Sequence, residues 1–356
     1  MQNKGILISD AHVKSRLWTN FPQIQGDSYR ALEKIKEAAK GSFIISCGDL
    51  FDSNRPSSAD LECVSNLMRS VEKFYYISGN HDDCVPAVIP SLGTNAVHLC
   101  QSPQLINGVP VFGIDYCNSK DLLIEGLSEV ASEMLKLEPI ARPVLVLHQK
   151  LDVFFMKDPT ITLQEIRDTL AHPCDIFIGD IHIRKLITSN EGFCLSPGPL
   201  VPQDIGQARH QQGATYVDFS SGTHVELKDI PVKVRDYTFL DSPEELEGAF
   251  KRALEAASDM LPPVIVVKVD PSYKLPKEYK SNQVIVLLDT ITEKLQKKAV
   301  EKATVSSLEE AVKNEIMETE KELSEIMVPL LIKLMHSEVP DEVLLGLLDK
   351  WEVVMT

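Results

Sequence analysis

The sequence predicts an α/β fold, and three observations support this prediction. Short apolar runs of strand length, rich in β-branched and aromatic residues, recur along the first 235 residues. Stretches with helical spacing of apolar residues lie between them, and such alternation is typical of a layered α/β sheet. Polar residues of the kinds that bind metals follow several runs directly. The predicted strands lie within 4–10, 41–49, 73–82, 109–115, 142–149, 174–182, 192–198, 213–219 and 223–230, and the helices within 28–41, 58–73 and 122–138.

The composition is that of a soluble globular protein large enough for two or three domains, with 356 residues, 44% of them hydrophobic and 25% charged. No window approaches the roughly 18–20 uninterrupted apolar residues of a membrane span. The N-terminus runs into a strand without a signal-peptide pattern, so we expect a cytoplasmic protein without membrane contact. Seven scattered cysteines, none in a C-x-x-C pair, argue against a disulfide framework and against a thiolate zinc site.

The net charge of −16 is concentrated towards the C-terminal end. Residues 236–356 contain 14 Lys and Arg against 24 Asp and Glu, whereas the first 235 residues contain 22 against 28. An acidic chain has no general attraction for nucleic acid. A protein of this composition that acts on DNA needs a local basic groove, bound cations or the surface of a partner.

The sequence also predicts the division of the chain. Residues 1–235 form the domain just described, and 236–290 read as a small α/β domain, with a helix in 242–260 opened by Ser242 as N-cap and Glu245 three residues on. Two further strands are expected within 262–270 and 284–289. Residues 291–356 are charged and helical, with apolar faces near the end that either dock onto a partner or pack back on the small domain.

Five of the predicted strands end in a polar cluster, and the carboxyl ends of strands in α/β sheets are where ligands bind. The residues are Asp10, His12, Asp49, Asn80, His81, His148, Asp180 and His182. Carboxylate, amide and imidazole groups are ligands for hard or borderline divalent ions. There are enough for two ions, with Asp49 as the bridge. Asp10, His12 and His182 would complete one ion, and Asn80, His148 and Asp180 the other.

His81 is left over as a candidate acid, placed to protonate a leaving alkoxide or to stabilise charge on a phosphate. Taken singly, each motif has a plainer explanation: D-x-H and G-D occur in turns and helix caps, and His148 could be a core histidine. Their order at successive strand ends favours a two-ion site instead. Asp180 and His182 are expected on one side of an extended strand, with Ile181 facing the apolar interior. The remaining histidines, His98 among them, are interpreted as structural residues or surface residues.

The stretches "SDAH", "GDLFD", "GNHDD", "LHQ" and "GDIH" resemble the calcineurin-like metallophosphoesterase superfamily. Within it the chain is most similar to the SbcD or meiotic-recombination-eleven family of DNA-repair nucleases. Three details favour that branch: "CGDLFDSNRPSS", with Asp52 three residues after Asp49; "SPGPLVPQDIGQ", after the last ligand; and the acidic C-terminal region. The motifs cover roughly the first 235 residues.

The resemblance implies a metal-binding β-sandwich flanked by helices, followed by a capping domain and a partner-binding segment. It implies a 3′-to-5′ exonuclease and endonuclease of DNA repair and recombination that uses two divalent ions, Mn²⁺ or alternatively Mg²⁺. The implied partners are DNA and an SbcC/Rad-fifty-type coiled-coil ATPase. A homodimer is also implied, through the helix in 58–73 and the segment after Asp82, unless these simply pack on the sheet. The compact length resembles phage or bacterial members, which would place the protein in a host or bacterial cytoplasm.

One residue departs from the family pattern, because Asp180 stands where the family usually has histidine. A carboxylate oxygen can replace an imidazole nitrogen as a ligand and favours a harder ion. The shorter side chain could also mark a decayed second site. Two rival functions follow: a phosphodiesterase of small nucleotides in the same superfamily, and a scaffold without nuclease activity.

Overall fold

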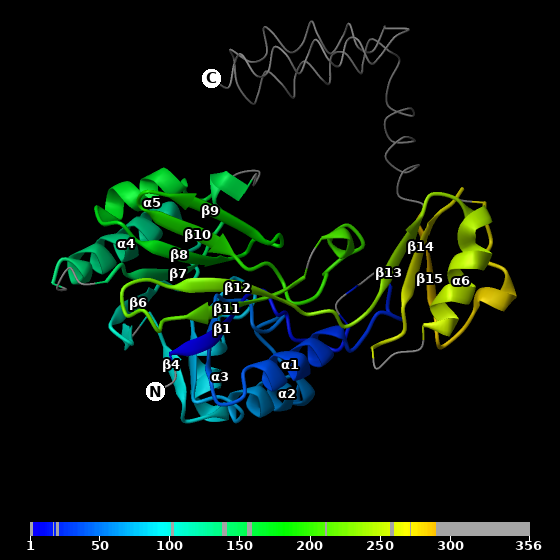
Figure 1. Ribbon diagram of the computed structural model, residues 1–356, viewed down its shortest axis with the longest axis horizontal. Coiled ribbons are helices and arrows are strands. Elements are labelled where there is room, and N and C mark those ends of the chain that lie inside the picture. The colour runs from blue at the N-terminus through cyan, green and yellow to red at the C-terminus, as the bar shows by residue number, and fades with distance from the viewer. Residues whose placement is uncertain are drawn as a thin grey trace, which may run out of the picture. The chain divides into compact units, whose positions relative to one another are not determined.

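The computed structural model describes residues 3–16, 18, 21–100, 103–136, 141–154, 159–210, 212–256, 260–270 and 272–289. Two six-stranded sheets and the helices on them form the main body, and a three-stranded sheet follows later in the chain (Figure 1). The predicted α/β class is therefore confirmed.

The first sheet is built around parallel strands at the start of the chain. Strands β1 to β4 are parallel neighbours, β11 pairs antiparallel with β1, and β12 pairs antiparallel with β11. In sheet order, the strands are β12 (Glu226–Pro231), β11 (Gly213–Asp218), β1 (Lys4–Ile8), β2 (Phe43–Ser46), β3 (Lys73–Tyr76) and β4 (Ala96–His98). The helices between these strands are α1 (Asp27–Ala38), α2 (Ser58–Met68) and α3 (Val85–Leu92).

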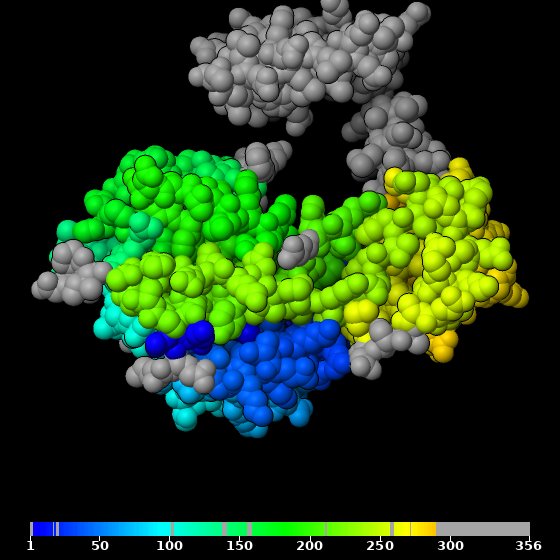
Figure 2. Space-filling view, in the orientation of Figure 1, coloured from blue at the N-terminus to red at the C-terminus, as the bar shows by residue number. Residues whose placement is uncertain are grey.

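The second sheet also has a parallel centre, made by β6, β7, β8 and β10, with β5 and β9 antiparallel at its edges. In sheet order, the strands are β5 (Gln104–Ile106), β6 (Val109–Gly113), β7 (Val144–His148), β8 (Asp175–Gly179), β10 (Gly192–Ser196) and β9 (Lys185–Ser189). Its helices are α4 (Lys120–Met134) and α5 (Leu163–Leu170). Helices α1 and α2 lie on one outer side of the two sheets, and α4 and α5 on the other (Figures 1 and 2).

Alternation along the strands separates the core into three layers. Ile6 and Ile44 face the cluster that contains residues of α1 and α2, whereas Leu7 and Ile45 face a cluster between the two sheets. In the second sheet, Phe177 joins that central cluster, and its neighbours on β8 face α4 and α5. Because adjacent side chains of a strand point to opposite faces, uninterrupted apolar runs are what a sheet covered on both faces requires. The arrangement is the predicted β-sandwich flanked by helices.

A small three-stranded sheet lies within the predicted range 236–290. Its strands are β13 (Tyr237–Leu240), β14 (Val264–Lys268) and β15 (Ile285–Asp289), in the order β13-β14-β15, and its helix is α6 (Leu246–Glu255). Ser242 is an N-cap as expected, but of a 3₁₀ turn, Pro243–Glu245, that leads into α6, and its side chain makes no capping hydrogen bond. Residues 291–356 lie outside the described residues, so the proposed domain boundaries stay a prediction.

Several short elements were not expected, namely β4, β5, β9, α3 and α5. Strands of three residues leave too little room for an alternating pattern, and α3 contains Pro90 inside the helix. Among the described residues, no helix is both long enough and apolar enough to cross a membrane.

Candidate metal centre

The carboxyl ends of five parallel strands place the predicted ligands together. Asp10, Asp49 and Asn80 follow β1, β2 and β3 of the first sheet, whereas His148 ends β7 and Asp180 follows β8 of the second. Of the six non-glycine residues with positive φ in the described part of the chain, four lie here: Asp10, His12, Asp49 and Asp180. A left-handed backbone is costly for such residues, and clusters of strained residues are typical of functional sites.

Two glycines make the close approach of these strand ends possible. A Cβ atom on Gly48, which has φ of 91°, would lie 2.5 Å from His148 Nδ1. A Cβ atom on Gly179 would lie 2.3 Å from the Cys47 carbonyl oxygen and 2.4 Å from the same imidazole nitrogen. Only glycine leaves room at both positions for the His148 ring.

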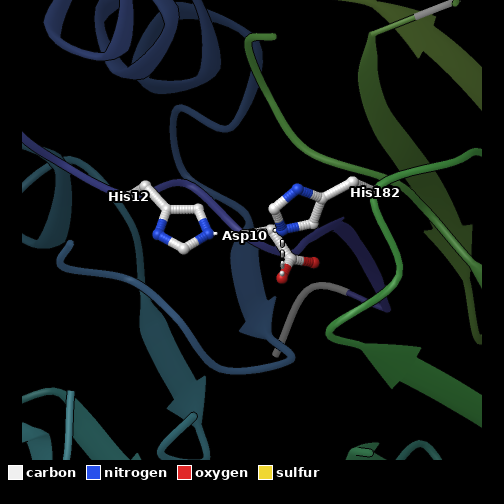
Figure 3. A group of neighbouring side chains, drawn as sticks. All are labelled: Asp10, His12 and His182. Carbon is white, nitrogen blue, oxygen red and sulfur yellow. Dashed lines mark hydrogen bonds and ion pairs between the residues drawn. The ribbon is translucent and has the colours of Figure 1, made fainter. Parts of the chain in front are cut away.

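One group of ligand atoms consists of Asp10, His12 and His182 (Figure 3). His12 Nε2 lies 3.4 Å from His182 Nε2, and His182 Nε2 lies 3.5 Å from Asp10 Oδ1. Figure 3 shows the two rings on either side, with His182 turned towards the Asp10 carboxylate. Nitrogens bound to one ion at about 2.1 Å lie roughly 3.0–3.5 Å apart. The spacing therefore suits two ligands of a single ion.

A second group consists of Asp10, Asp49 and His148. His148 Nε2 lies 3.4 Å from Asp49 Oδ2 and 3.0 Å from Asn80 Oδ1. The same Asp49 oxygen lies 3.6 Å from His12 Nε2, which is the position that a bridging carboxylate would take. Asp10 belongs to both groups, although the sequence pattern assigned it to one ion only.

The groups that offset the negative charges of Asp10 and Asp49 are imidazole rings. Burial alone would raise the pKa of Asp10, but a hydrogen bond to His182 and the charges of His148 and His12 hold that pKa well below its usual range. Burial would lower the pKa of His148, but Asp49 and Asp10 raise it to about 10. Buried carboxylates that keep their charge against burial need a cation, and a divalent ion supplies more charge than a protonated ring.

Two buried polar atoms of the site have no hydrogen-bond partner, His12 Nδ1 and Asp180 Oδ2. The His148 ring, in contrast, directs Nδ1 to the Cys47 carbonyl oxygen at 2.7 Å, which leaves Nε2 for an ion. A backbone partner on the outer nitrogen is how metal-binding imidazoles are commonly oriented. The donor set, its orientation and the orphaned Asp180 oxygen fit divalent ions.

Asp180 adopts a conformation that the sequence pattern did not suggest. Strand β8 ends at Gly179, and Asp180 has φ of 72°, so the expected extended strand through His182 is wrong. The Asp180 amide donates to Asp10 Oδ1 at 3.1 Å, and burial together with Asp10 raises the pKa of its carboxyl group. Its carboxylate is in neither tight group of ligand atoms. Ile181 is buried beside α4 and α5, as expected.

His81 lies at the exposed rim of the centre. Its backbone amide donates to Asp49 Oδ1 at 2.9 Å, and its ring meets the His12 ring edge to face with centroids 4.9 Å apart. The ring nitrogen Nδ1 lies 3.3 Å from the Asp52 carbonyl oxygen. The location suits contact with a substrate, although the ring also forms a third possible ligand group with His12 and Asp52.

Three supporting residues escaped the sequence analysis as functional positions. Asp82 is fully buried and accepts from the amides of Leu50, Phe51 and Gly79, which holds the loops that carry Asp49 and Asn80. Gln207 Nε2 lies 3.1 Å from His182 Nδ1. Asp52 Oδ1 lies 3.5 Å from His12 Nδ1. Asp82 and Gln207 stand within "GNHDD" and "SPGPLVPQDIGQ", but only their contacts reveal what they support.

A family model of the calcineurin-like phosphoesterases matches residues 6–168. A search of curated proteins found no match. Among solved structures, the Thermus thermophilus protein TT1561 is 12% identical, with a TM-score of 0.42, and the match covers 65% of this chain and 100% of that one. The phosphopantetheinyl hydrolase PptH from Mycobacterium tuberculosis is 13% identical, with a TM-score of 0.36 and coverage of 54% and 88%. Chaetomium thermophilum Vps29 is 10% identical, with a TM-score of 0.30 and coverage of 64% and 93%.

The family match spans the strands that carry Asp10, Asp49, Asn80 and His148. Divalent metals are typical of this family, and the groups just described are the candidates to bind them here. Residues 6–168 thus match the calcineurin-like phosphoesterase model, and the sandwich of sheets flanked by helices is consistent with that fold.

Proposed function

We propose that the protein is a Mn²⁺-dependent DNA nuclease, an exonuclease and endonuclease that works as a subunit with a coiled-coil ATPase. The observation that carries the proposal is the position of Asp49 Oδ2, 3.4 Å from His148 Nε2 and 3.6 Å from His12 Nε2. One carboxylate within reach of both ligand groups is what a two-ion phosphoesterase centre needs.

The ligands divide between two ions in the proposed centre. Asp10, His12 and His182 would hold one, and Asn80 and His148 the other, with Asp49 shared and Asp10 close to both. Asp180 would join the second set through its unpartnered Oδ2. Two divalent ions, when bound, stabilise phosphoryl oxygens and lower the pKa of a bound water.

The chain's own residues orient the ligands and supply a proton. Cys47 and Gln207 contact the outer nitrogens of His148 and His182, and Asp82 holds the two ligand loops together. The exposed His81 donates a proton to the leaving oxygen of the phosphodiester. Because the carboxylates are buried beneath the histidine rim, the scissile phosphate approaches from the side of Asn80 and His81.

Asn80 and His81, at the rim of the centre, are both exposed. This exposure agrees with a polymeric substrate. The net charge of −16 explains why a partner would be needed to hold DNA. The nuclease assignment rests on the motifs that resemble the SbcD family, and it includes a dimer. Helices α2 and α3 pack on the first sheet through Val64 and Ile89, so a dimer would use their outward faces.

The test is cleavage by the full chain after removal and return of metal. Loaded with Mn²⁺, it should degrade linear duplex DNA from 3′ ends and cut single strands internally, and should do so faster with a coiled-coil ATPase partner. Metal content should reach two ions per chain. Hydrolysis of cyclic nucleotides without DNA cleavage would favour the small-nucleotide phosphodiesterase. Failure to bind any divalent ion would favour the scaffold.

The ATPase arm of the proposal has a separate test in the C-terminal segment, which lies outside the described residues. Deleting residues 324–356 should abolish binding of the partner and leave Mn²⁺-dependent cleavage of simple substrates unchanged. A truncated chain that still binds the ATPase, or that no longer folds, would contradict docking through this segment.

A further inference from the structure

A second cluster of metal-binding side chains lies outside the centre described above. His98, Cys100 and Asp115 each place one ligand atom within 4.8 Å of the others. His98 ends β4 of the first sheet, and Asp115 follows β6 of the second, so the cluster joins the two sheets. Its composition differs from that of the centre around Asp49, which contains no thiol.

A fourth candidate ligand, Cys117, lies beside this cluster. Its thiol donates to the Asp115 carbonyl oxygen at 3.4 Å, and it is half-buried. Cys117 is not part of the tight group of ligand atoms, so its thiol would have to turn towards Cys100 to complete the set. Burial raises the pKa of Cys117, and so do Cys100 and Asp115. Burial and Asp115 raise the pKa of Cys100 as well.

The geometry around Asp115 holds these groups in place. Asp115 Oδ1 accepts from the Ser78 amide at 2.7 Å, and both carboxylate oxygens accept from His98 Nε2, at 2.8 and 2.9 Å. The His98 ring stacks on Tyr76, with centroids 5.0 Å apart and planes at 7°. The cluster is open to solvent on the side of Cys100, which is exposed.

We propose that His98, Cys100, Asp115 and Cys117 form a second metal site, which binds one Zn²⁺ ion. Two thiolates, an imidazole and a carboxylate make up a four-ligand set that suits Zn²⁺, and the harder Mn²⁺ prefers oxygen ligands. On binding, both thiols release their protons, and the bond from His98 to Asp115 gives way to the ion. The absence of a C-x-x-C motif is no obstacle, because the ligands come from different strand ends.

A Zn²⁺ ion here would stiffen the support of the catalytic loops. Between Asp115 and Cys117, the Tyr116 amide donates a hydrogen bond to the Ser78 carbonyl oxygen. The Cys117 carbonyl oxygen accepts a hydrogen bond from Gln149 at 3.2 Å. Ser78 and Gln149 stand two residues and one residue from Asn80 and His148, respectively. The site is therefore structural in role and distinct from the ions that act on substrate.

Binding of Co²⁺ tests this cluster specifically, because thiolate ligands give bound Co²⁺ a characteristic absorption band. The full chain, reduced and freed of metal, is titrated with Co²⁺ while near-ultraviolet absorption is recorded. We expect a thiolate-to-cobalt charge-transfer band that saturates at no more than three Co²⁺ per chain, because the centre around Asp49 can take two of them, and that is abolished by adding Zn²⁺. The centre around Asp49 contributes nothing to this band because it has no thiolate.

Variants assign the band to its ligands. Cys100→Ser and Cys117→Ser should each lose it, whereas Cys63→Ser, which changes a half-buried thiol on α2, should keep it. Zn²⁺ should raise the midpoint of thermal unfolding more in the parent chain and in Cys63→Ser than in Cys100→Ser and Cys117→Ser, which keep only the centre around Asp49. No band in the parent chain, or a band that persists in either Cys100→Ser or Cys117→Ser, would overturn the proposal.

Discussion

Asp49 Oδ2 lies 3.4 Å from His148 Nε2, with both side chains buried, one from each of the two sheets. This contact stabilises the packing of the two sheets at the carboxyl ends of their strands only if a positive charge balances the Asp49 carboxylate. Burial would raise the pKa of Asp49, but the hydrogen bond and charge of His148 keep it below its usual range. The pair therefore provides two ligands of a cation site in a preformed arrangement.

Replacing Asp49 with alanine should empty both ion sites, because one oxygen of this carboxylate lies near His12 of one ligand set and near His148 of the other. Without it, two divalent ions close together would repel each other with less negative charge between them. Metal content of the purified variant, measured after loading with Mn²⁺, should fall from two ions per chain towards none. Asp83→Ala, on the exposed side of the same loops, should retain both ions. Retention of two ions in Asp49→Ala would show that the carboxylate is not a bridge.

His81→Asn should abolish cleavage of DNA and leave the metal content unchanged. The reason is that the ring lies at the exposed rim and acts on the substrate, and removal of a general acid typically costs about 10²–10⁴-fold in rate. The comparison variant is His172→Asn, an exposed histidine after α5, which should cleave at the parent rate. Loss of ions together with activity in His81→Asn would mean that His81 is a ligand.

Asp180 variants test whether the aspartate serves the second ion. Asp180→His should keep activity and shift the preferred metal away from Mn²⁺, because a neutral imidazole replaces a charged oxygen ligand. Asp180→Ala should weaken binding of the second ion and slow cleavage strongly, measured as the Mn²⁺ concentration needed for half-maximal rate. An unchanged rate and unchanged stoichiometry in Asp180→Ala would identify the aspartate as a bystander.

The buried ion pair of Arg235 and Asp27 should matter for stability rather than for chemistry. Arg235 donates to both Asp27 oxygens, at 2.6 and 2.8 Å, and both side chains are almost fully buried. Asp27→Asn leaves a buried guanidinium without its charge partner and should cost about 3–5 kcal/mol of unfolding free energy. Asp229→Asn, which removes an exposed partner of Arg184, should cost at most about 1 kcal/mol. Equal losses in denaturant titrations would contradict this account.

The capping residue Glu165 predicts an acid-dependent contribution to stability. Hydrogen bonds from Lys120 and from the Thr162 amide and hydroxyl lower the pKa of Glu165 from 4.5 to about 2. The folded state thus binds this proton less readily than the unfolded state. Its contribution is present above pH about 4.5 and is lost as the pH falls towards about 2. The difference in unfolding free energy between the parent and Glu165→Gln should shrink over that range; a constant difference would refute the assignment.

Much of the sandwich could be predicted from the sequence because its central strands are buried on both faces. Runs such as "GILI" and "DIFIG" are typical of strands covered on both faces, and the polar residues after them mark one edge of each sheet. The short edge strands β4 and β5 carry too few residues for a pattern, and the 3₁₀ turn Pro243–Glu245 before α6 was not expected.

The sequence by itself determined which side chains are available at the strand ends, since strand direction and the position of each polar cluster follow from local pattern. Only the tertiary structure decided how they meet. It placed Asp10 in both ligand groups, turned Asp180 into a left-handed conformation, and supported the loops through Asp82 and Gln207. It also brought His98 and Cys100 to Asp115, which their spacing did not suggest. The physical reason is that local pattern sets strands and faces, whereas distances between strand ends depend on how two sheets pack together.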